Sequence, residues 1–204
     1  MECIATDSYR LAKKIVELDS TVENLINIVI PGKNIGELAK ILNDNDENVE
    51  IHIFSNKILF KFDNILFQSR LLNGTFPDTS RLIPDTFELE IKTDLDELYS
   101  VIDRAALLTS EKEKNVIKFE TNENEAIVSS NTPEIGRVEE RLAITKNNDK
   151  EIKIAFSSKF MMEALKTINS KDIRILLNSD IKPIILKTDE DENLIQLLLP
   201  IKTY

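Results

Sequence analysis

The chain has 204 residues, of which 42% are hydrophobic, so it is long enough to build one large domain or two ordinary domains around a sizeable core. Its formal net charge of -10 argues against a protein whose whole surface embraces phosphates, although a local basic face is compatible with an acidic total. No apolar run approaches the roughly 18 residues of a membrane span, and the N-terminus lacks a basic region followed by an apolar segment.

The single cysteine, Cys3, excludes an intrachain disulfide and fits a reducing compartment. We interpret it as a small apolar strand residue without chemistry of its own. The sequence therefore predicts a globular cytoplasmic protein.

A unit of one strand, one helix and three strands recurs along the chain, with a period of about 60 residues. After a strand-like stretch from Cys3 to Leu18, the units open with predicted strands at Asn27–Ile30, Phe87–Ile91 and Glu151–Phe156. Apolar residues at helical spacing predict helices at Lys33–Leu42, Leu95–Leu108 and Ser158–Ile168. Three short strands follow each helix, at Val49–Phe54, Ile58–Phe62 and Ile65–Leu71; Val116–Glu120, Ala126–Ser130 and Arg137–Ile144; Ile173–Leu177, Pro183–Lys187 and Leu194–Leu199.

Polar residues at the helix starts support these assignments, since their side chains could accept the unpaired N–H groups of a first turn. The candidates are Asn34 or Lys33, Asp94, and Ser157 or Ser158. The pattern predicts an α+β fold, with antiparallel sheets on one side and paired helices on the other. Residues 85–204 have the size of a complete domain, whereas residues 1–84 supply half of another domain plus a connector.

The connector, Thr75–Pro84, is bounded by two prolines and contains Phe76, Leu82 and Ile83. Proline fixes φ and removes a backbone donor, so this segment cannot continue a central strand. It is also too apolar for an idle linker. We therefore expect it to pack between two structural units and to shape a surface there.

Candidates for catalysis are few. His52, the only histidine, lies in the alternating run Ile51–Phe54, which indicates a solvent-facing strand residue rather than a general base. Asp44–Glu47 and Asp189–Glu192 lack the glycine and terminal glutamate of a calcium loop and are interpreted as solvated turns. No glycine-rich phosphate-binding motif is present.

Two pairs of lysines, Lys33 with Lys40 and Lys159 with Lys166, stand seven residues apart and so share one helix face each. Such faces could meet phosphates, but the spacing alone favours ordinary solvated helix surfaces, because the second predicted helix is acidic.

Apolar residues also gather near the start, in the connector and in the Leu-rich C-terminal stretch. A C-terminus of this kind should be held down by other parts of the chain. If connector and C-terminal stretch pack together, they form either a hydrophobic peptide groove or simply more core.

Four segments in collinear order resemble the bacterial sliding clamps, the β subunits of DNA polymerase III. They are Ala5–Ala12, Val29–Lys33, Phe76–Pro84 and Leu199–Lys202. The resemblance implies a DNA-clamp fold, in which two protomers of three domains each form a ring that encircles duplex DNA without reading its sequence. It also implies that this chain is a C-terminal fragment that lacks the first domain and about half of the second.

The family binds short linear motifs of the replicative DNA polymerase, the clamp loader and repair polymerases in a groove between its second and third domains. Carried over by position, the resemblance implies that the following residues line this groove: Thr6, Ser8, Tyr9, Arg10, Leu11, Pro77, Arg81, Leu82, Leu197, Leu199, Pro200, Ile201 and Lys202. Apolar walls would take leucine and aromatic side chains, and the basic residues would meet carboxylates at the rim.

Lys33 matches a basic position of the DNA channel, and we extend this interpretation to Lys40, Lys159 and Lys166. The ring-closing face of the third domain is matched by Leu107, Leu108, Glu134, Glu139 and Glu140. The partner of that face would be the first domain of another protomer, so we expect this chain alone not to close a homodimeric ring, and its strand edges to be covered by neighbours.

The sequence thus predicts a non-enzymatic processivity factor without cofactor or metal, of which this chain keeps the peptide groove. Two alternatives stay open: a structural interaction domain without a groove, and a metal-dependent hydrolase that uses paired carboxylates.

Overall fold

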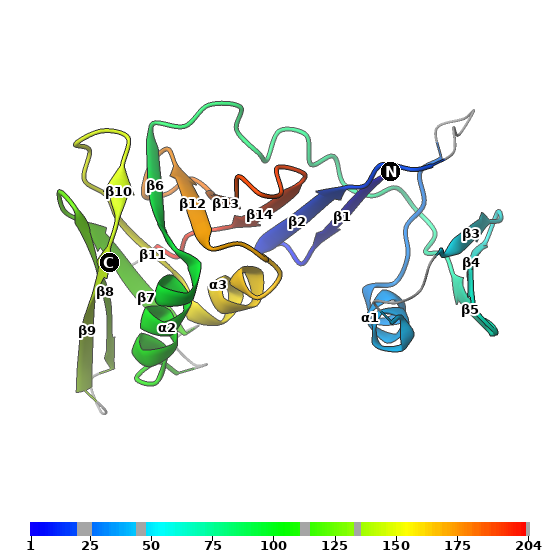
Figure 1. Cartoon of the computed structure of the whole chain (residues 1–204), viewed down its shortest axis with the longest axis horizontal. Helices are drawn as coiled ribbons and strands as arrows, with labels where there is room; N and C mark the ends of the chain where they lie inside the picture. The colour runs from blue at the N-terminus through cyan, green and yellow to red at the C-terminus, as the bar shows by residue number, and fades with distance from the viewer. Residues whose placement is uncertain (20–25, 44–47, 111–114, 133–135, 203–204) are drawn as a thin grey trace. The chain divides into compact units, whose positions relative to one another are not determined.

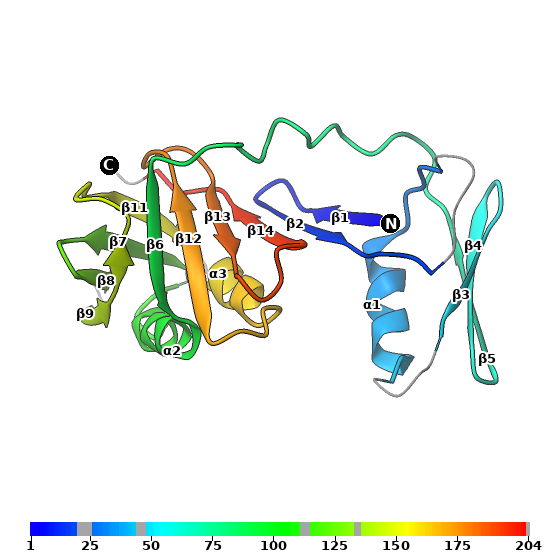
Figure 2. The ribbon, with the colours of Figure 1, turned by 45° about the horizontal axis from the view of Figure 1, so that its top comes forward.

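The computed structural model describes residues 1–19, 26–43, 48–110, 115–132 and 136–202. The chain divides into two compact units. The larger unit combines residues 1–18 with 80–204, and the smaller unit comprises residues 19–79. Figures 1 and 2 show the ribbon of each unit.

A seven-stranded antiparallel sheet forms the larger unit's main layer within the described residues, in the order β1-β2-β14-β13-β12-β6-β10. Its strands are β1 Glu2–Thr6, β2 Arg10–Ile15, β14 Leu194–Leu198, β13 Ile184–Lys187, β12 Asp172–Leu177, β6 Leu89–Asp94 and β10 Thr145–Lys146. The first and last parts of the chain meet in this sheet, because β2 pairs with β14 from Leu194 opposite Lys14 to Leu198 opposite Arg10.

A second sheet of four described strands has the order β11-β7-β8-β9 and leaves β9 at its edge. Its strands are β11 Lys153–Ser157, β7 Val116–Thr121, β8 Glu125–Thr132 and β9 Gly136–Ala143. The helices α2, Leu95–Ala106, and α3, Ser158–Leu165, contact each other and lie side by side on one face of the seven-stranded sheet (Figures 1 and 2). The predicted α+β fold, with antiparallel sheets and paired helices, is confirmed.

One core cluster joins both sheets and both helices of the larger unit. The apolar residues at helical spacing in α2, among them Leu98 and Ile102, are buried in it, as is Leu165 of α3. The periodicity of 3.6 residues therefore identifies the buried helix faces correctly. Asp94 and Ser157 cap the two helices as predicted, since each side chain accepts from the backbone N–H three residues later.

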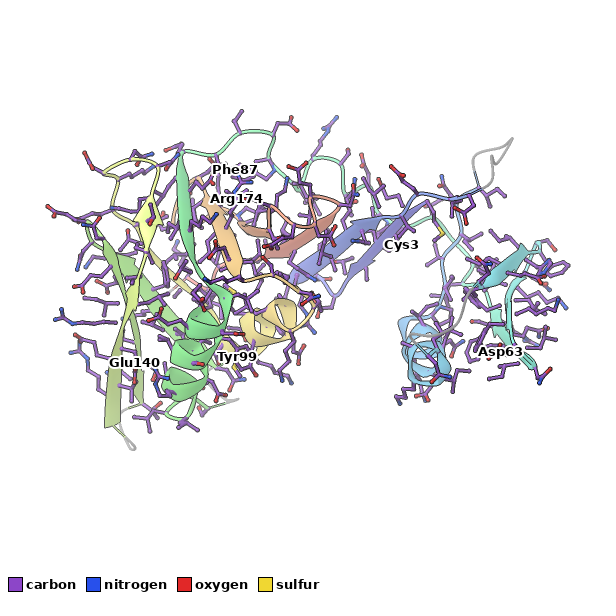
Figure 3. All side chains as sticks on the ribbon, viewed as in Figure 1. Cys3, Asp63, Phe87, Tyr99, Glu140 and Arg174 are labelled. Atoms are coloured by element: carbon purple, nitrogen blue, oxygen red, sulfur yellow. The ribbon has the colours of Figure 1, made fainter. Side chains whose placement is uncertain are left out.

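The other face of the seven-stranded sheet carries a second cluster, which we call the outer cluster. It contains the buried residues Leu11, Leu176, Ile185 and Leu197, and the partly buried Ile4, Ile83, Phe87 and Ile195 pack against it. Ile83 and Phe87 come from the connector and the segment that follows it; Phe87 is labelled in Figure 3. Because side chains alternate across a strand, Leu197 faces this cluster while its neighbour Leu198 belongs to the core.

An ion-pair network also crosses this sheet. Arg174 of β12, labelled in Figure 3, forms a bidentate pair with Glu90 of β6 at 2.7 and 3.0 Å. The same guanidinium donates to Asp189 at 3.0 Å. The network thus links β12 to β6 and to the turn that follows β13, and it holds the strands in register.

The smaller unit consists of α1, Gly32–Ile41, and a sheet in the order β3-β4-β5, with β3 Glu50–Ile53, β4 Lys57–Phe62 and β5 Ile65–Arg70. Leu38 of α1 packs with Ile58, Phe60 and Phe62 in a core of its own. The predicted capping role of Lys33 or Asn34 is wrong: Pro31 precedes the helix without a side-chain cap, and Asn34 donates instead to the Ser69 hydroxyl at 2.8 Å.

One further sequence expectation meets a different structure. The predicted strand Asn27–Ile30 is wrong, because this segment has no regular structure; Leu72 donates to Val29 O, but no strand ladder forms beside it. The compact units group residues 1–18 with residues 80–204, while the predicted division into domains 1–84 and 85–204 stays a prediction. Backbone pairing of β2 with β14 explains this grouping, since it ties the N-terminal hairpin to the larger unit.

Cys3 lies in β1, as the strand interpretation requires, and its side chain is exposed (Figure 3). His52 is also an exposed strand residue, which confirms its predicted place; its ring nitrogen lies 3.2 Å from Glu50.

Candidate functional site

The turn between β1 and β2 is built by its own side chains. Asp7 accepts hydrogen bonds from the backbone N–H groups of Tyr9 and Arg10, both at 3.1 Å. The Thr6 hydroxyl donates to Arg10 O at 2.7 Å. These bonds stabilise the left-handed backbone conformation of Ser8, whose φ of 73° is unfavourable for residues other than glycine. The turn is therefore a preformed structure.

Arg10 fastens this turn to α3. Its guanidinium pairs with Asp7 at 2.9 Å and with Glu163 of α3, and it lies 4.5 Å from the ring centroid of Phe160. The ring of Tyr9 stacks on the same Phe160, with centroids 6.2 Å apart. The sequence suggested that Arg10 meets a partner's carboxylate, whereas here two carboxylates of the chain itself already hold it.

The electrostatics of this contact favour the charged forms. Partial burial raises the pKa of Asp7, but hydrogen bonds from Arg10 and from the backbone outweigh it and hold this pKa below its usual value. Partial burial likewise lowers the pKa of Arg10, and its hydrogen bonds with Glu163 and Asp7 outweigh that effect. Asp7 and Arg10 are thus an ion pair throughout the physiological pH range.

The C-terminal stretch is held down, as its apolar character predicted. Leu199 N donates to Tyr9 O at 2.9 Å, and Ile201 N donates to Ala155 O at 2.7 Å. The bond of Leu199 extends the pairing of β14 with β2 beyond the end of the strand, whereas the bond of Ile201 ties the C-terminal stretch to β11. They bring the turn Asp7–Tyr9 and the C-terminal stretch together, although about 190 residues separate them in sequence.

The predicted groove residues of the larger unit fall into three groups by environment. Leu11 and Leu197 are buried in the outer cluster, beside Ile83 of the connector. Pro200 and Ile201 are half-buried, and Arg10 is partly covered. The remainder are exposed: Thr6, Ser8, Tyr9, Arg81, Leu82, Leu199 and Lys202. Among them Tyr9, Leu82 and Leu199 expose 61%, 46% and 42% of their surface, which is high for apolar or aromatic side chains.

Pro77 belongs to the smaller unit, where it is exposed. Its place in a groove with the other residues stays a prediction.

A cleft of about 390 Å³ lies between the hairpin β1-β2, strand β14 and helix α3. Four predicted groove residues border it, namely Thr6, Arg10, Leu11 and Leu197. Gln196, whose amide donates to the Thr167 hydroxyl at 2.8 Å, and Glu163 border it as well. The cleft is thus on the α3 side of the sheet, opposite the outer cluster.

Sequence reasoning missed the part that α3 plays here. Phe160 and Glu163, three residues apart on the helix, supply an aromatic face and a carboxylate to Arg10. Their spacing showed a shared helix face, but no local signal links that face to a residue of the N-terminal hairpin.

The candidate DNA-facing lysines are all exposed. Lys40 pairs with Glu37 at 2.9 Å, and the Lys166 ammonium lies 5.6 Å from the ring centroid of Tyr99. Lys33 and Lys40 belong to the smaller unit, and Lys159 and Lys166 to the larger unit. Lys33 and Lys40 lie within α1, whereas Lys159 lies in α3 and Lys166 is the residue that caps its C-terminus. A common DNA channel stays a prediction.

The candidate ring-closing residues lie around the end of α2 and strand β9. Leu107, just after α2, is 76% exposed, and Leu108 is half-buried. Glu140 of β9, labelled in Figure 3, accepts from Arg104 of α2 at 2.9 Å, and Glu139 pairs with Arg137. Glu134 lies outside the described residues.

The described part of the chain contains no group of three or more His, Cys, Asp or Glu side chains that could hold a metal ion. Of the two acidic turns, Asp44–Glu47 lies outside the described residues, and in the other turn Asp189 and Asp191 pair with basic side chains. None of the described helices is long and apolar enough to cross a membrane.

Comparisons with known proteins give a consistent answer. The family model described as the C-terminal domain of the DNA polymerase III beta subunit matches residues 80–202, and the model of the central domain of that subunit matches residues 1–78. A beta sliding clamp of Staphylococcus aureus is 45% identical over 202 residues, which are 99% of this chain and 53% of that protein. This chain therefore spans about half the length of such relatives.

Solved structures agree with these matches. The sliding clamp of Bacillus subtilis has a TM-score of 0.94 and 42% identity, over 100% of this chain and 54% of the other. A sliding clamp of Bartonella birtlesii, solved bound to griselimycin, has a TM-score of 0.91 and 26% identity, over 98% of this chain and 54% of the other. On the two family models and this likeness, the chain belongs to the family of DNA polymerase III beta subunits, the beta sliding clamps.

Proposed function

We propose that the chain works as part of a processivity clamp and that its larger unit binds short linear motifs of partner proteins. The observation that carries this proposal is that three segments distant in the sequence come together around strands β2 and β14 of the seven-stranded sheet. The turn Asp7–Tyr9 is bonded to Leu199, and Leu11 and Leu197 pack with Ile83 of the connector. Exposed apolar side chains next to these contacts, Leu82 and Leu199, suit a leucine or aromatic side chain of a peptide.

The partners in this proposal are the replicative DNA polymerase, the clamp loader and repair polymerases. They would share one surface and so compete for it. The clamp itself contributes no catalytic group and needs no cofactor; its effect on synthesis comes from keeping a polymerase attached to its template. The bound ligand of the Bartonella birtlesii clamp supports a ligand-binding surface in the family.

A titration with a fluorescent peptide that carries a leucine and a phenylalanine at its C-terminus tests the peptide site. We expect saturable binding that Leu82→Ala weakens about tenfold, since burying a leucine side chain on binding is worth about 1.5 kcal/mol or more. Leu107→Ala is the control, because it truncates another exposed leucine, which lies after α2.

Amide chemical shifts locate the peptide in the same experiment. Shifts that cluster at Tyr9, Arg81, Leu82 and Ile201 support the proposal. Equal affinity of the Leu82→Ala and Leu107→Ala variants, or shifts confined to other regions, would contradict it, and the alternative of an interaction domain without a groove would then be favoured.

We extend the proposal to duplex DNA, which the complete ring encircles in this interpretation. Lys33, Lys40, Lys159 and Lys166 would contact phosphates without reading bases, which suits a protein that must slide. Replacing the two lysines of one helix with glutamate should weaken non-specific DNA binding of the full-length clamp and flatten its salt dependence, whereas Lys153→Glu on β11 is the control.

The ring interface completes the proposal. Leu107 and Leu108, together with Glu134, Glu139 and Glu140, would face the first domain of a second protomer in the full-length homodimer. Leu107→Glu in the full-length protein should convert dimers to monomers in analytical ultracentrifugation. An unchanged dimer would place the interface elsewhere.

A further inference from the structure

The segment between the connector and β6 is clamped at its main chain. The side-chain amide of Asn178, the first residue after β12, donates to Thr86 O at 3.0 Å. Its oxygen accepts from Glu88 N at 2.9 Å, and Leu177 O also accepts from Glu88 N, at 3.1 Å. One planar amide thus bridges two main-chain positions on either side of Phe87.

The loop that leads from β10 to β11 closes on the same segment from another side. Asn148 donates to Glu88 O at 2.8 Å, and the Lys150 ammonium pairs with the Glu88 carboxylate. The Lys150 ammonium also lies 3.4 Å from Asn178 O. Asn178, Asn148 and Lys150 therefore form one structure around Glu88, which we call the connector anchor.

The connector anchor decides where Phe87 and Ile83 lie. With Thr86 O and Glu88 N both bound to Asn178, the backbone on each side of Phe87 is fixed, and its ring packs against the outer cluster. Ile83 packs against the same cluster, four residues earlier. Pro84, between them, restricts φ to one region, so the segment has little freedom to take up a shift at its end.

The bonds of Asn178 also restrict the positions of the exposed residues that precede Ile83. Leu82 lies four residues before Thr86, a span of at most about 14 Å of extended chain. Leu82 and Arg81 are exposed, and Ile83 and Phe87, which follow them, pack against the outer cluster. Their positions therefore depend on how firmly the segment Ile83–Glu88 is held.

We propose that Asn178 is a positioning residue of the peptide-binding surface: through its two bonds to Thr86 and Glu88 it holds the connector on the outer cluster, and with it Arg81 and Leu82. This inference rests on the proposed function of the larger unit. Asn178 would not touch the peptide. It supplies the pre-organisation that spares a bound peptide the entropy cost of ordering the connector.

The positioning role requires the side-chain amide of Asn178, which both donates and accepts a hydrogen bond. Alanine removes both bonds, and aspartate keeps an acceptor for Glu88 N but places a second oxygen against Thr86 O. We expect Asn178→Ala and Asn178→Asp to weaken binding of the leucine and phenylalanine peptide about tenfold. Asn148→Ala, in an exposed loop residue, removes the bonds of Asn148 to Glu88 O and from Lys150 N without touching β12, and should weaken binding about threefold.

Ser130→Ala is the matched control for a loss of stability alone. It removes a buried hydrogen bond of the same unit, from the Ser130 hydroxyl to Ala105 O at 2.7 Å, between β8 and α2. It should lower the melting temperature as Asn178→Ala does and leave the peptide affinity unchanged at 25 °C. Amide hydrogen exchange at Glu88 gives the structural readout, which should accelerate in Asn178→Ala and not in Ser130→Ala.

The outcomes separate this inference from the proposal beneath it. Weaker binding in the Asn178 and Asn148 variants, with Ser130→Ala unchanged, supports a positioning role. Faster exchange at Glu88 with unchanged affinity overturns it, although the peptide site itself would stand. If the wild-type chain binds no peptide at all, the proposed function fails and this inference falls with it.

Discussion

Arg10 makes three contacts at once, with two carboxylates and one aromatic face. Exposed ion pairs contribute little, because water screens them and long side chains lose entropy, but a cation above an aromatic ring adds to the attraction. The side chains of Arg10 and Glu163 are 32% and 43% exposed, so this pair is only partly screened. Its main effect is to keep the N-terminal hairpin on α3.

A double-mutant cycle on Arg10→Ala and Glu163→Ala tests this contact. We expect a coupling energy of about 0.5–1 kcal/mol in urea unfolding, from the partly covered pair. The pair of Arg137 with Glu139, where the arginine is 67% exposed, is the control and should show almost no coupling. Equal coupling in the two cycles would mean that Arg10 has no special role.

Asp7 makes this part of the molecule sensitive to acid. Its folded pKa lies below the usual value of about 4, mainly because bonds from Arg10 and the backbone outweigh partial burial. A carboxylate of this kind stabilises the fold at pH values above its unfolded pKa, and that stabilisation is lost as the pH falls through the lower folded pKa.

Two measurements check the sign of this effect. The stability difference between wild type and Asp7→Asn should be largest near neutral pH and should shrink as the pH falls below about 4. In Arg10→Ala the NMR titration midpoint of Asp7 should rise. A midpoint that stays unchanged would mean that Arg10 does not control the pKa of Asp7.

At the scale of the element, helices α1 and α2 differ in how their N-termini are capped. Asp94 accepts from Glu97 N at 2.9 Å at the start of α2, whereas α1 begins after Pro31 without a side-chain cap. Sequence alone placed both helices, and it identified the cap of α2 because the cap is a local interaction. It mistook Asn34 for a cap, because the partner of Asn34 is Ser69 on β5, 35 residues away.

Removing the N-terminal cap of α2 should destabilise the larger unit. Asp94→Ala is expected to destabilise the larger unit by about 1 kcal/mol, whereas Asp94→Asn keeps an acceptor and should cost less. Asp96→Ala, in the first turn of the same helix, is the control because Asp96 does not cap it. Equal losses in the Asp94 and Asp96 variants would point to a general charge effect at the helix start instead.

The outer cluster shows what strand alternation can and cannot predict. Alternation correctly separates Leu197 from Leu198, but it does not say which of the two faces the core. That choice depends on Ile83 of the connector and Phe87 of the segment that follows it, which cover the other face. Here a segment without regular structure completes a hydrophobic layer.

For the whole molecule, the two units have separate cores. The smaller unit buries Leu38, Ile58, Phe60 and Phe62, and the larger unit has both its main core and the outer cluster. A unit of about 60 residues has a stability of only a few kcal/mol.

A large-to-small change in the smaller core should therefore unfold that unit alone. Phe60→Ala is expected to cost about 3–5 kcal/mol, enough to broaden or collapse the amide resonances of residues 26–79 while those of residues 80–202 stay dispersed. Ile102→Ala is the reciprocal test in the larger unit. Loss of both sets of resonances in Phe60→Ala would show that the units fold as one.

The sequence by itself determined the helices, most of the strands and the family, because these depend on local periodicity and on short collinear motifs such as Phe76–Pro84. It wrongly predicted a strand at Asn27–Ile30. Only the tertiary structure decided which groups meet: the side chains of Arg10 and Glu163, the Asn178 amide and the main chain of Thr86 and Glu88, and the main chains of Leu199 and Tyr9. Each of these contacts joins residues far apart in the chain, and each follows from sheet register and pleat, which place a side chain on one face or the other.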